Sequence, residues 1–290
     1  MNQKNTLRIE PLGFPWKTKD PFLFCVYHQD FFPQGNEKLE PAASLAGRQI
    51  GQDFVIKDGW RMYHGKKIPG FPSHPHRGFE TVTVVQQGVV DHADSRGASG
   101  RYGNGDVQWM TAGSGIQHSE MFPMLNQRKN NTLELFQIWL NLPKHKKMVE
   151  PHFKMIWRNS IPVHRMLDYD SNEIELHQYA GSFNGMTSPE TAPDSWAKDP
   201  KNEVAIWHIR LEAGSRWKLP ASRKGINRCL YFFQGDKLEL MGTEVQSGFM
   251  IELDGLEEVE LANVDQNSKL LLLQGKPIGE PVDKLSLIHI

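Results

Sequence analysis

Short runs in which apolar residues alternate with polar ones recur along this chain of 290 residues, and glycine, proline, asparagine or aspartate closes most of them. Helical periodicity is scarce. Successive side chains of an extended strand point to opposite faces, so this alternation predicts β-strands. Many short strands with frequent turn signals predict an all-β sandwich or barrel. The clearest runs are ETVTVV (80–85), DVQWMT (106–111), TLELFQIWLNL (132–142), AIWHIRL (205–211), CLYFFQG (229–235), LELMG (238–242) and LLLQG (271–275).

The strand-like runs form two groups that share a loose order of strands and turns. A chain of this length can bury one large all-β core or two ordinary ones. Residues 182–202, before the second group, are rich in proline, serine, threonine and glycine, which predicts a long loop or a linker. The second group lacks the histidines of the first apart from His208. We therefore expect two similar β-domains, of which only the first keeps a polar site.

Charge and cysteine content narrow the function classes. The formal net charge is −1, so no bulk field favours nucleic acid or an anionic membrane. No apolar run reaches the ~18 residues of a membrane span, and the N-terminus lacks the apolar segment of a signal peptide. Cys25 and Cys229 each lie in an apolar strand-like run, which predicts buried free thiols in a reducing compartment. We expect a cytoplasmic protein without nucleic-acid or membrane partners.

Two pairs of polar residues carry the strongest chemical signal. His74 and His76 stand two positions apart at the start of a strand-like run, and His118 and Glu120 repeat that spacing in GIQHSEM. Residues i and i+2 of a strand share a face, so each pair presents both side chains to one side. If the two strands lie side by side, three imidazoles and one carboxylate converge. That donor set suits a divalent first-row metal with positions left open for a small ligand.

A third pair, His92 and Asp94 in DHADSRG, also has the i, i+2 spacing. Its flanks are polar and glycine-rich, which favours a loop or an edge strand. We interpret this pair as a support behind the metal ligands or a surface feature, ahead of a ligand pair. Trp109, Met110 and Phe79 could form an apolar wall of the site or belong to the core, and the sequence leaves both interpretations open.

These motifs resemble those of the pirin family, within the cupin superfamily. The matching segments are FPSHPHRGFETVTVV (71–85), DVQWMTAGSGIQHSEM (106–121) and LPKHKKMVEP (142–151), with DPFLF upstream and LLLQGKPIGEPV downstream. The resemblance implies a bicupin: two jelly-roll β-barrels facing each other, with few short helices. It implies an N-terminal cupin domain with the metal site over residues 1–150. A C-terminal cupin-like domain without metal ligands would follow over residues 151–282.

By motif match, the metal ligands would be His74, His76, His118 and Glu120, and the metal most favoured by the family is Fe(II). The general cupin pattern offers Glu80 as a competing carboxylate. In pirins the carboxylate ligand matches Glu120, so we expect Glu80 to be a supporting or structural acid. Thr111 stands where many cupins carry proline.

The resemblance also implies a reaction. Bacterial pirins of this kind are similar to quercetin 2,3-dioxygenases, which open a flavonol ring with O2. Glu120 is the candidate that would accept the proton of the flavonol hydroxyl. The alternatives are a metalloenzyme with another substrate and an iron-dependent redox-sensing regulator that acts through a protein partner, as animal pirins do. Nothing in the ligand set separates these roles.

The chain departs from the family pattern after GEPV (279–282). Pirins continue with a GPFVMN-like segment and a helical tail that would cover apolar surface. The last six residues, LSLIHI, are what CTG TCT CTT ATA CAC ATC encodes, a transposase end sequence used in preparing sequencing libraries. We therefore expect residues 283–290 to be a non-native tail of a truncated reading frame. The metal site should be intact, because all four ligands lie between residues 74 and 120.

Overall fold

The computed structural model describes residues 8–282, and within them strands are the dominant regular structure. The helical segments of this range are four single turns of 3-10 helix, which are η1 (Lys144–Lys146), η2 (Arg158–Ser160), η3 (Trp196–Lys198) and η4 (Pro200–Asn202). The all-β prediction is confirmed, and most of each run singled out in the sequence lies in a strand. The chain divides into two compact units, which we describe separately.

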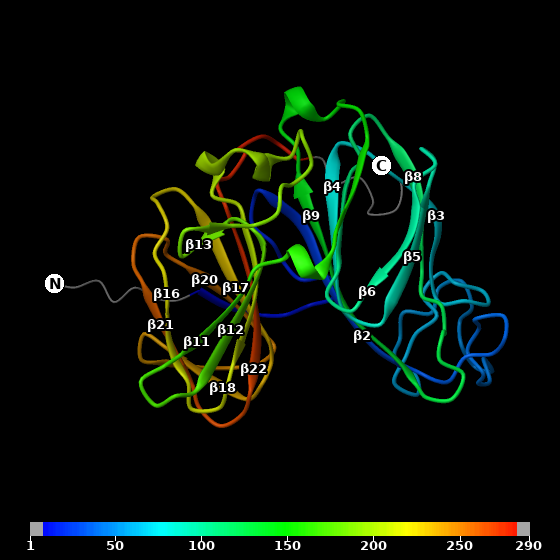
Figure 1. The fold of residues 1–290 in the computed structure, drawn as a ribbon, viewed down its shortest axis with the longest axis horizontal. Coiled ribbons are helices and arrows are strands. Elements are labelled where there is room, and N and C mark those ends of the chain that lie inside the picture. Colours follow the sequence, from blue (N-terminus) through cyan, green and yellow to red (C-terminus); the bar gives the residue numbers. More distant parts are fainter. Residues whose placement is uncertain (1–7, 283–290) are drawn as a thin grey trace. The chain divides into compact units, whose positions relative to one another are not determined.

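Residues 26–158 form most of the first barrel, which contains two antiparallel sheets (Figure 1). One sheet has the order β10-β7-β4-β9-β2 and the other the order β3-β8-β5-β6. The strands are β2 (Phe22–Phe32), β3 (Gly70–His76), β4 (Phe79–Gln87), β5 (Val89–Asp94), β6 (Ser99–Gly103), β7 (Val107–Thr111), β8 (Ile116–Met121), β9 (Asn131–Asn141) and β10 (His152–Ile156).

The second barrel contains residues 8–25, 159–191 and 195–279. Its larger sheet has the order β1-β20-β17-β22-β15-β12-β11, its smaller sheet the order β16-β21-β18-β19, and β13 pairs with β14 alone. The strands are β1 (Arg8–Pro11), β11 (Val163–Leu167), β12 (Glu173–Ala180), β13 (Ser182–Phe183), β14 (Met186–Thr187), β15 (Ala205–Leu211), β16 (Arg216–Leu219), β17 (Asn227–Gln234), β18 (Lys237–Leu240), β19 (Thr243–Gln246), β20 (Phe249–Leu253), β21 (Val259–Asn263) and β22 (Ser268–Gly275).

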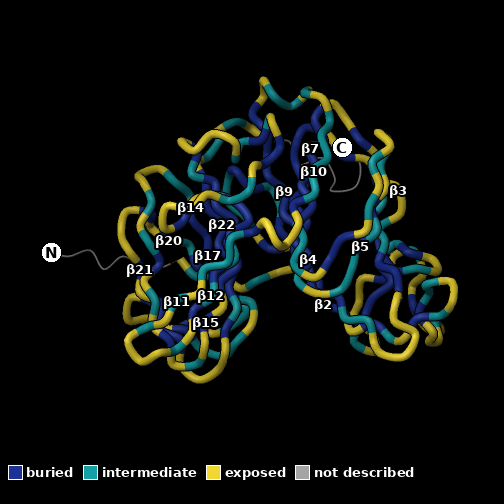
Figure 2. The backbone as a smooth tube through the Cα atoms, viewed as in Figure 1, coloured by how far each residue is buried: buried dark blue, intermediate teal, exposed yellow. Residues whose placement is uncertain are grey.

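Strand alternation builds each core. In β17, Leu230 and Phe232 point to the inner face and join an apolar cluster contributed by both sheets of the second barrel. The first barrel has its own cluster, which includes Val85 of β4 and Leu135 of β9. Figure 2 shows buried residues along the strands of both units and exposed residues in the connecting loops. Burial of these side chains, at about 1.5–3 kcal/mol each, is the main stabilising contribution.

The N-terminal segment and residues 182–202 add detail to the expected organisation. Residues 8–25 group with the second barrel because β1 pairs with β20. Residues 182–202 form a loop containing the β13–β14 hairpin and two 3-10 turns, and most of it belongs to the second barrel. The expected domain boundary at residue 150 stays a prediction. The predicted non-native tail, residues 283–290, lies outside the described residues.

Two further expectations can be compared with the structure. Cys25 and Cys229 are both buried and free, as their apolar context predicted. In the range from residue 8 to residue 282, no helix has the length and apolar character that crossing a membrane requires.

Candidate metal centre

The three histidines singled out in the sequence meet inside the first barrel. β3 and β8 pair antiparallel, and this register places His74 directly opposite His118. The Nε2 atom of His74 lies 3.0 Å from that of His76 and 3.0 Å from that of His118. One ring nitrogen from each of the three residues lies within 4.8 Å of the other two. The condition set in the sequence analysis, that the two strands lie side by side, is therefore met.

A glycine allows β3 and β8 to approach this closely. Gly70, at the start of β3, has φ +129°, which side chains rarely adopt. A Cβ atom at this position would lie 2.4 Å from the carbonyl oxygen of Glu120. The pairing of β3 with β8, which aligns the two candidate ligand pairs, therefore depends on glycine at position 70.

The backbone fixes the tautomer of His74. Its Nδ1 lies 2.9 Å from the carbonyl oxygen of Pro72. A carbonyl oxygen can only accept, so Nδ1 carries the proton and Nε2 presents a lone pair to the cluster.

The pair His92 and Asp94 favours one tautomer of His118. Asp94 Oδ2 lies 3.0 Å from His92 Nε2, so the carboxylate accepts the His92 proton and leaves His92 Nδ1 as an acceptor. Gln108 Nε2 donates to that atom at 2.9 Å, and His118 Nδ1 faces it at 3.4 Å. A bare Nδ1 on His118 would face the lone pair of His92 Nδ1, so this contact favours a proton on His118 Nδ1, which leaves a lone pair on Nε2 toward the cluster, as in His74. A support of this kind is common behind metal-bound histidines.

Burial keeps the imidazoles of His76 and His118 neutral. Desolvation, followed by the neighbouring His74, lowers the pKa of His76 to about 3. Desolvation is also the largest cause that lowers the pKa of His118, followed by His76, His74 and His92. Neutral imidazole is the form that binds metal, so at pH 7 His76 and His118 are in the state that can act as a ligand.

The distances between the histidine nitrogens can be compared with those between the ligands of a metal ion. Two ring nitrogens that both present lone pairs at 3.0 Å repel each other unless a cation lies between them. Donor atoms at right angles around a metal at ~2.1 Å lie about 3.0 Å apart. The separations of His74 from His76 and from His118 have this size, so each of these two pairs fits neighbouring positions around one metal.

Glu120 lies beside the cluster and is fixed by two hydrogen bonds. It is 2% exposed, and its Oε2 lies 3.9 Å from His118 Nε2. Gln137 Nε2 donates to Oε2 at 2.6 Å, and Thr83 Oγ1 donates to Oε1 at 3.1 Å. Glu120 is not among the donor atoms that lie mutually within 4.8 Å, which are those of the three histidines. The structure thus brings the three histidines together and places the carboxylate next to them.

Glu80, the competing carboxylate, is held elsewhere by hydrogen bonds. It is fully buried on β4, where Oε1 accepts from Thr111 Oγ1 at 2.8 Å and from Trp109 Nε1 at 3.1 Å. Thr111, the residue that departs from the usual cupin proline, thus binds Glu80. These bonds give Glu80 the structural environment that the sequence analysis expected.

An aromatic wall stands beside His76. Phe79 and Trp139 stack with ring centroids 4.5 Å apart. Their ring centroids lie 5.2 and 5.3 Å, respectively, from that of His76. Of the three candidates left open in the sequence, Phe79 contacts the site, whereas Met110 lies in a small apolar cluster. Trp139 was missed, because nothing in TLELFQIWLNL distinguishes it from a core residue.

Two family models match the chain. The one described as Pirin matches residues 18–140, and the one described as Pirin C-terminal cupin domain matches residues 206–285. Pirin-1 of Arabidopsis thaliana is 33% identical over 234 residues, which cover 73% of this chain and 69% of the relative. A Pseudomonas aeruginosa protein provisionally named a quercetin 2,3-dioxygenase is 35% identical over 214 residues, covering 73% and 70%.

Solved structures show the same fold. A crystal structure of quercetin 2,3-dioxygenase from Acinetobacter baumannii is 26% identical, covers 97% of this chain and 87% of its own, and superposes with a TM-score of 0.71. A protein from Geobacillus kaustophilus is 26% identical, with coverage of 97% and 94% and a TM-score of 0.63.

Proposed function

The chain belongs to the pirin family, and from that premise we propose that it is a metal-dependent dioxygenase of the quercetin 2,3-dioxygenase type. The resemblance drawn from the motifs and the two-barrel cupin fold are both confirmed. The proposal goes further in naming the reaction, which rests on the site. The observation that carries it is the cluster of His74, His76 and His118, whose lone pairs converge within 4.8 Å.

We assign His74, His76, His118 and Glu120 as the metal ligands and Fe(II) as the metal. The three imidazoles would supply three nitrogen ligands, and a small shift of the carboxylate would complete the set. When bound, Fe(II) would supply Lewis acidity toward a flavonol 3-hydroxyl and electrons for the activation of O2. The remaining coordination positions would stay open to these two reactants.

Glu120 is also the proton acceptor in this proposal. Gln137 and Thr83 hold its carboxylate so that Oε2 faces the cluster. A hydroxyl group placed at an open position would lie within reach of this oxygen, and general-base assistance of this kind contributes typically ~10²–10⁴-fold.

The aromatic wall would orient the flat substrate. Phe79 and Trp139 present a stacked, largely buried surface next to His76. A flavonol ring packed against it would be held in one plane and shielded from water on that side. Buried, free cysteines are consistent with a reducing compartment, and we place the protein in the cytoplasm.

The test is anaerobic loading with Fe(II), followed by an assay of quercetin loss and carbon monoxide release. The variants are His76→Ala, which removes a ligand, and Glu120→Gln, which keeps the shape but removes the base. His145→Ala, at an exposed position of the same unit, is the matched control. We expect turnover in wild type and control and its loss in both site variants.

Two results would overturn the proposal. If iron binds stoichiometrically without turnover, the site serves another substrate or a redox-sensing role. If no metal binds at all, the ligand assignment itself is wrong.

A further inference from the structure

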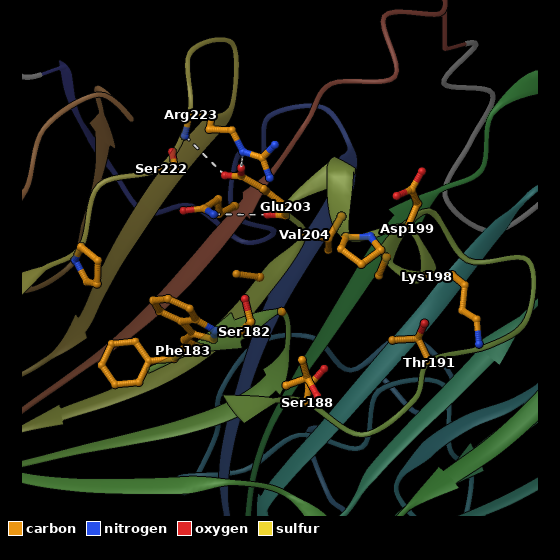
Figure 3. A pocket seen from close by; sticks show the side chains of 18 of the residues that line it. Ser182, Phe183, Ser188, Thr191, Lys198, Asp199, Glu203, Val204, Ser222 and Arg223 are labelled. Carbon is orange, nitrogen blue, oxygen red and sulfur yellow. Dashed lines mark hydrogen bonds and ion pairs between the residues drawn. The ribbon is translucent and has the colours of Figure 1, made fainter. Parts of the chain in front are cut away.

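The second barrel contains a cavity that the metal centre does not explain. Its volume is about 740 Å³, and all of its lining residues belong to the second barrel. Strands β13, β15, β17 and β22 contribute to it, together with the loop of residues 187–204 and the segment 220–223. Figure 3 shows this cavity, with Phe183 on one side and the pair Glu203 and Arg223 on another.

Arg228 is the unusual residue of this cavity. It lies on β17, on the inner face shared with Leu230 and Phe232, so the strand directs a guanidinium group into the barrel. The side chain is 1% exposed. Its Nε and Nη1 atoms have no hydrogen-bond partner, and no carboxylate within residues 8–282 forms an ion pair with it. A buried cation in this state is costly unless something pairs with it.

The other charged residues of the lining are already engaged. Glu203 forms an ion pair with Arg223, and Glu190 forms one with Lys198. Asp199 is exposed and caps the turn η4 by accepting from the amide of Lys201.

Burial lowers the pKa of Arg228 to about 10, and the charge of Glu203 acts in the opposite direction. The guanidinium therefore stays charged at pH 7, and the cavity offers one unpaired positive charge.

The remaining lining fits a flat apolar group with polar edges. Phe183 and Trp207 meet edge to face with centroids 5.4 Å apart, and both belong to the core cluster of this barrel. The lining also carries hydroxyl groups: Ser182, Ser188 and Ser222 line the cavity, and Thr191 is buried with an unpartnered Oγ1. An apolar wall with a few convergent polar groups is the usual make-up of a small-molecule site.

We propose that the second barrel binds a small aromatic carboxylate, with the carboxylate held by Arg228 and the ring packed against Phe183 and Trp207. A guanidinium matches the geometry of a carboxylate, and one negative charge neutralises one buried cation. A phosphate ester would place a charge of roughly −2 near the carboxylate of Glu203, so a ligand with a single negative charge is favoured. In this proposal the second barrel also has a polar site, whereas the sequence analysis expected one in the first barrel only.

The experiment measures benzoate binding to the full-length chain by isothermal titration calorimetry, with benzamide as the neutral analogue. The test variant is Arg228→Met, which keeps bulk and removes charge. Arg223→Met is the matched control, because Arg223 lines the same cavity but is exposed and paired with Glu203. Binding is repeated in His76→Ala, which removes a ligand from the first barrel and so excludes benzoate held by metal.

We expect benzoate to bind wild type, Arg223→Met and His76→Ala alike, and to bind Arg228→Met at least about 30-fold more weakly. Benzamide should bind none of them comparably. Arg228→Met should also keep or raise the melting temperature, because it removes an unpaired buried charge. The proposal is overturned if Arg228→Met binds benzoate like wild type or if His76→Ala loses the binding. It is also overturned if wild type shows no binding at a benzoate concentration of about 10 mM, which would detect even a very weak ligand.

Arg228→Lys keeps the result interpretable if the methionine variant fails to fold. Lysine retains the charge but lacks the planar fork. We expect it to bind benzoate more weakly than wild type and more tightly than any folded neutral variant. Equal binding by lysine and wild type would contradict the role of the guanidinium fork.

Discussion

His92 and His118 face each other through their Nδ1 atoms at 3.4 Å, and Asp94 holds the far side of His92 at 3.0 Å. The three side chains form a line that ends at the metal cluster. Because a carboxylate can only accept, each ring in the line has one favoured tautomer. The geometry therefore links an acid on β5 to the lone pair that His118 offers on β8.

Breaking this line should weaken metal binding without unfolding the barrel. In Asp94→Asn, the amide can donate to His92 Nε2, which would reverse the His92 tautomer and turn an N–H toward His118. We expect the metal affinity to fall about 10–100-fold. Competition with a chromophoric chelator measures this change.

Asp91→Asn is the control, since Asp91 lies on the same strand and pairs at the surface with Arg101. It should leave the affinity unchanged. Equal affinities of Asp94→Asn and wild type would show that Asp94 only packs behind the site.

Gln137 should matter for turnover more than for metal content. It donates to Glu120 at 2.6 Å while its own Oε1 accepts from Trp139 Nε1 at 3.2 Å, so the amide is held in one orientation. In Gln137→Leu, Glu120 keeps only the hydrogen bond from Thr83. We expect about a tenfold loss of turnover with iron still bound. Iron analysis together with the quercetin assay measures both quantities, and unchanged turnover would contradict a positioning role for Gln137.

Metal loading should stabilise the first barrel. A ligand at 100 times its Kd adds about 2.7 kcal/mol to the free energy of unfolding, which corresponds to about 5–10 °C for a unit of this size. Calorimetry of the loaded and chelator-treated protein measures the shift. His76→Ala should abolish it, whereas His145→Ala should retain it. A shift that persists in His76→Ala would place the metal elsewhere.

The shared face of each candidate pair could be predicted because strand periodicity is a local property. His74 and His76, like His118 and Glu120, share a face whatever the rest of the fold does. That the two pairs meet depends on the β3–β8 register, which the sequence could only pose as a condition. The residues that support the site were harder to predict. Trp139 and Gln137 lie in an ordinary strand pattern, and only the tertiary structure gives them a role.

The second barrel shows a different limit of prediction from the sequence. Within residues 8–282, the group of three potential metal ligands that the structure brings together is that of the first barrel. The signal for the cavity of the second barrel was a single arginine in NRCLYFF, an otherwise apolar strand. A lone charge in such a run is usually exposed at the surface, and only the tertiary structure shows that Arg228 is buried and lines the same cavity as Phe183 and Trp207.

Gly70→Ala should damage the site through the backbone. The added Cβ would lie 2.4 Å from the carbonyl oxygen of Glu120, in addition to the strain at φ +129°. Gly97→Ala separates the two effects, because Gly97 also has a positive φ, +88°, but nothing lies within 4 Å of its Cβ position. We expect about 1 kcal/mol of destabilisation at Gly97 and at least about 3 kcal/mol at Gly70, measured by urea unfolding. Equal losses would show that β3 and β8 can separate without cost.

A buried histidine away from the metal site should make stability depend on pH. His28 is 4% exposed, and its Nδ1 donates to the hydroxyl of Tyr63, which itself donates to Asp30. Burial, followed by the charge of Arg61, lowers the pKa of His28 to about 3. The unfolded chain, with a pKa of about 6.5, then binds more protons than the folded one between these values. The contribution to stability is complete above pH 6.5 and is lost as the pH falls toward 3.

His28→Asn tests this directly, because the amide can replace the Nδ1 donor but cannot titrate. Between pH 7.5 and 5.5, the metal-free wild type should lose about 1.4 kcal/mol more unfolding free energy than the variant. Urea unfolding at both pH values measures the difference. His145→Asn, at an exposed position, should follow the wild type. If His28→Asn loses as much stability as the wild type over this range, then His28 becomes protonated within the folded barrel, and its burial does not hold it neutral.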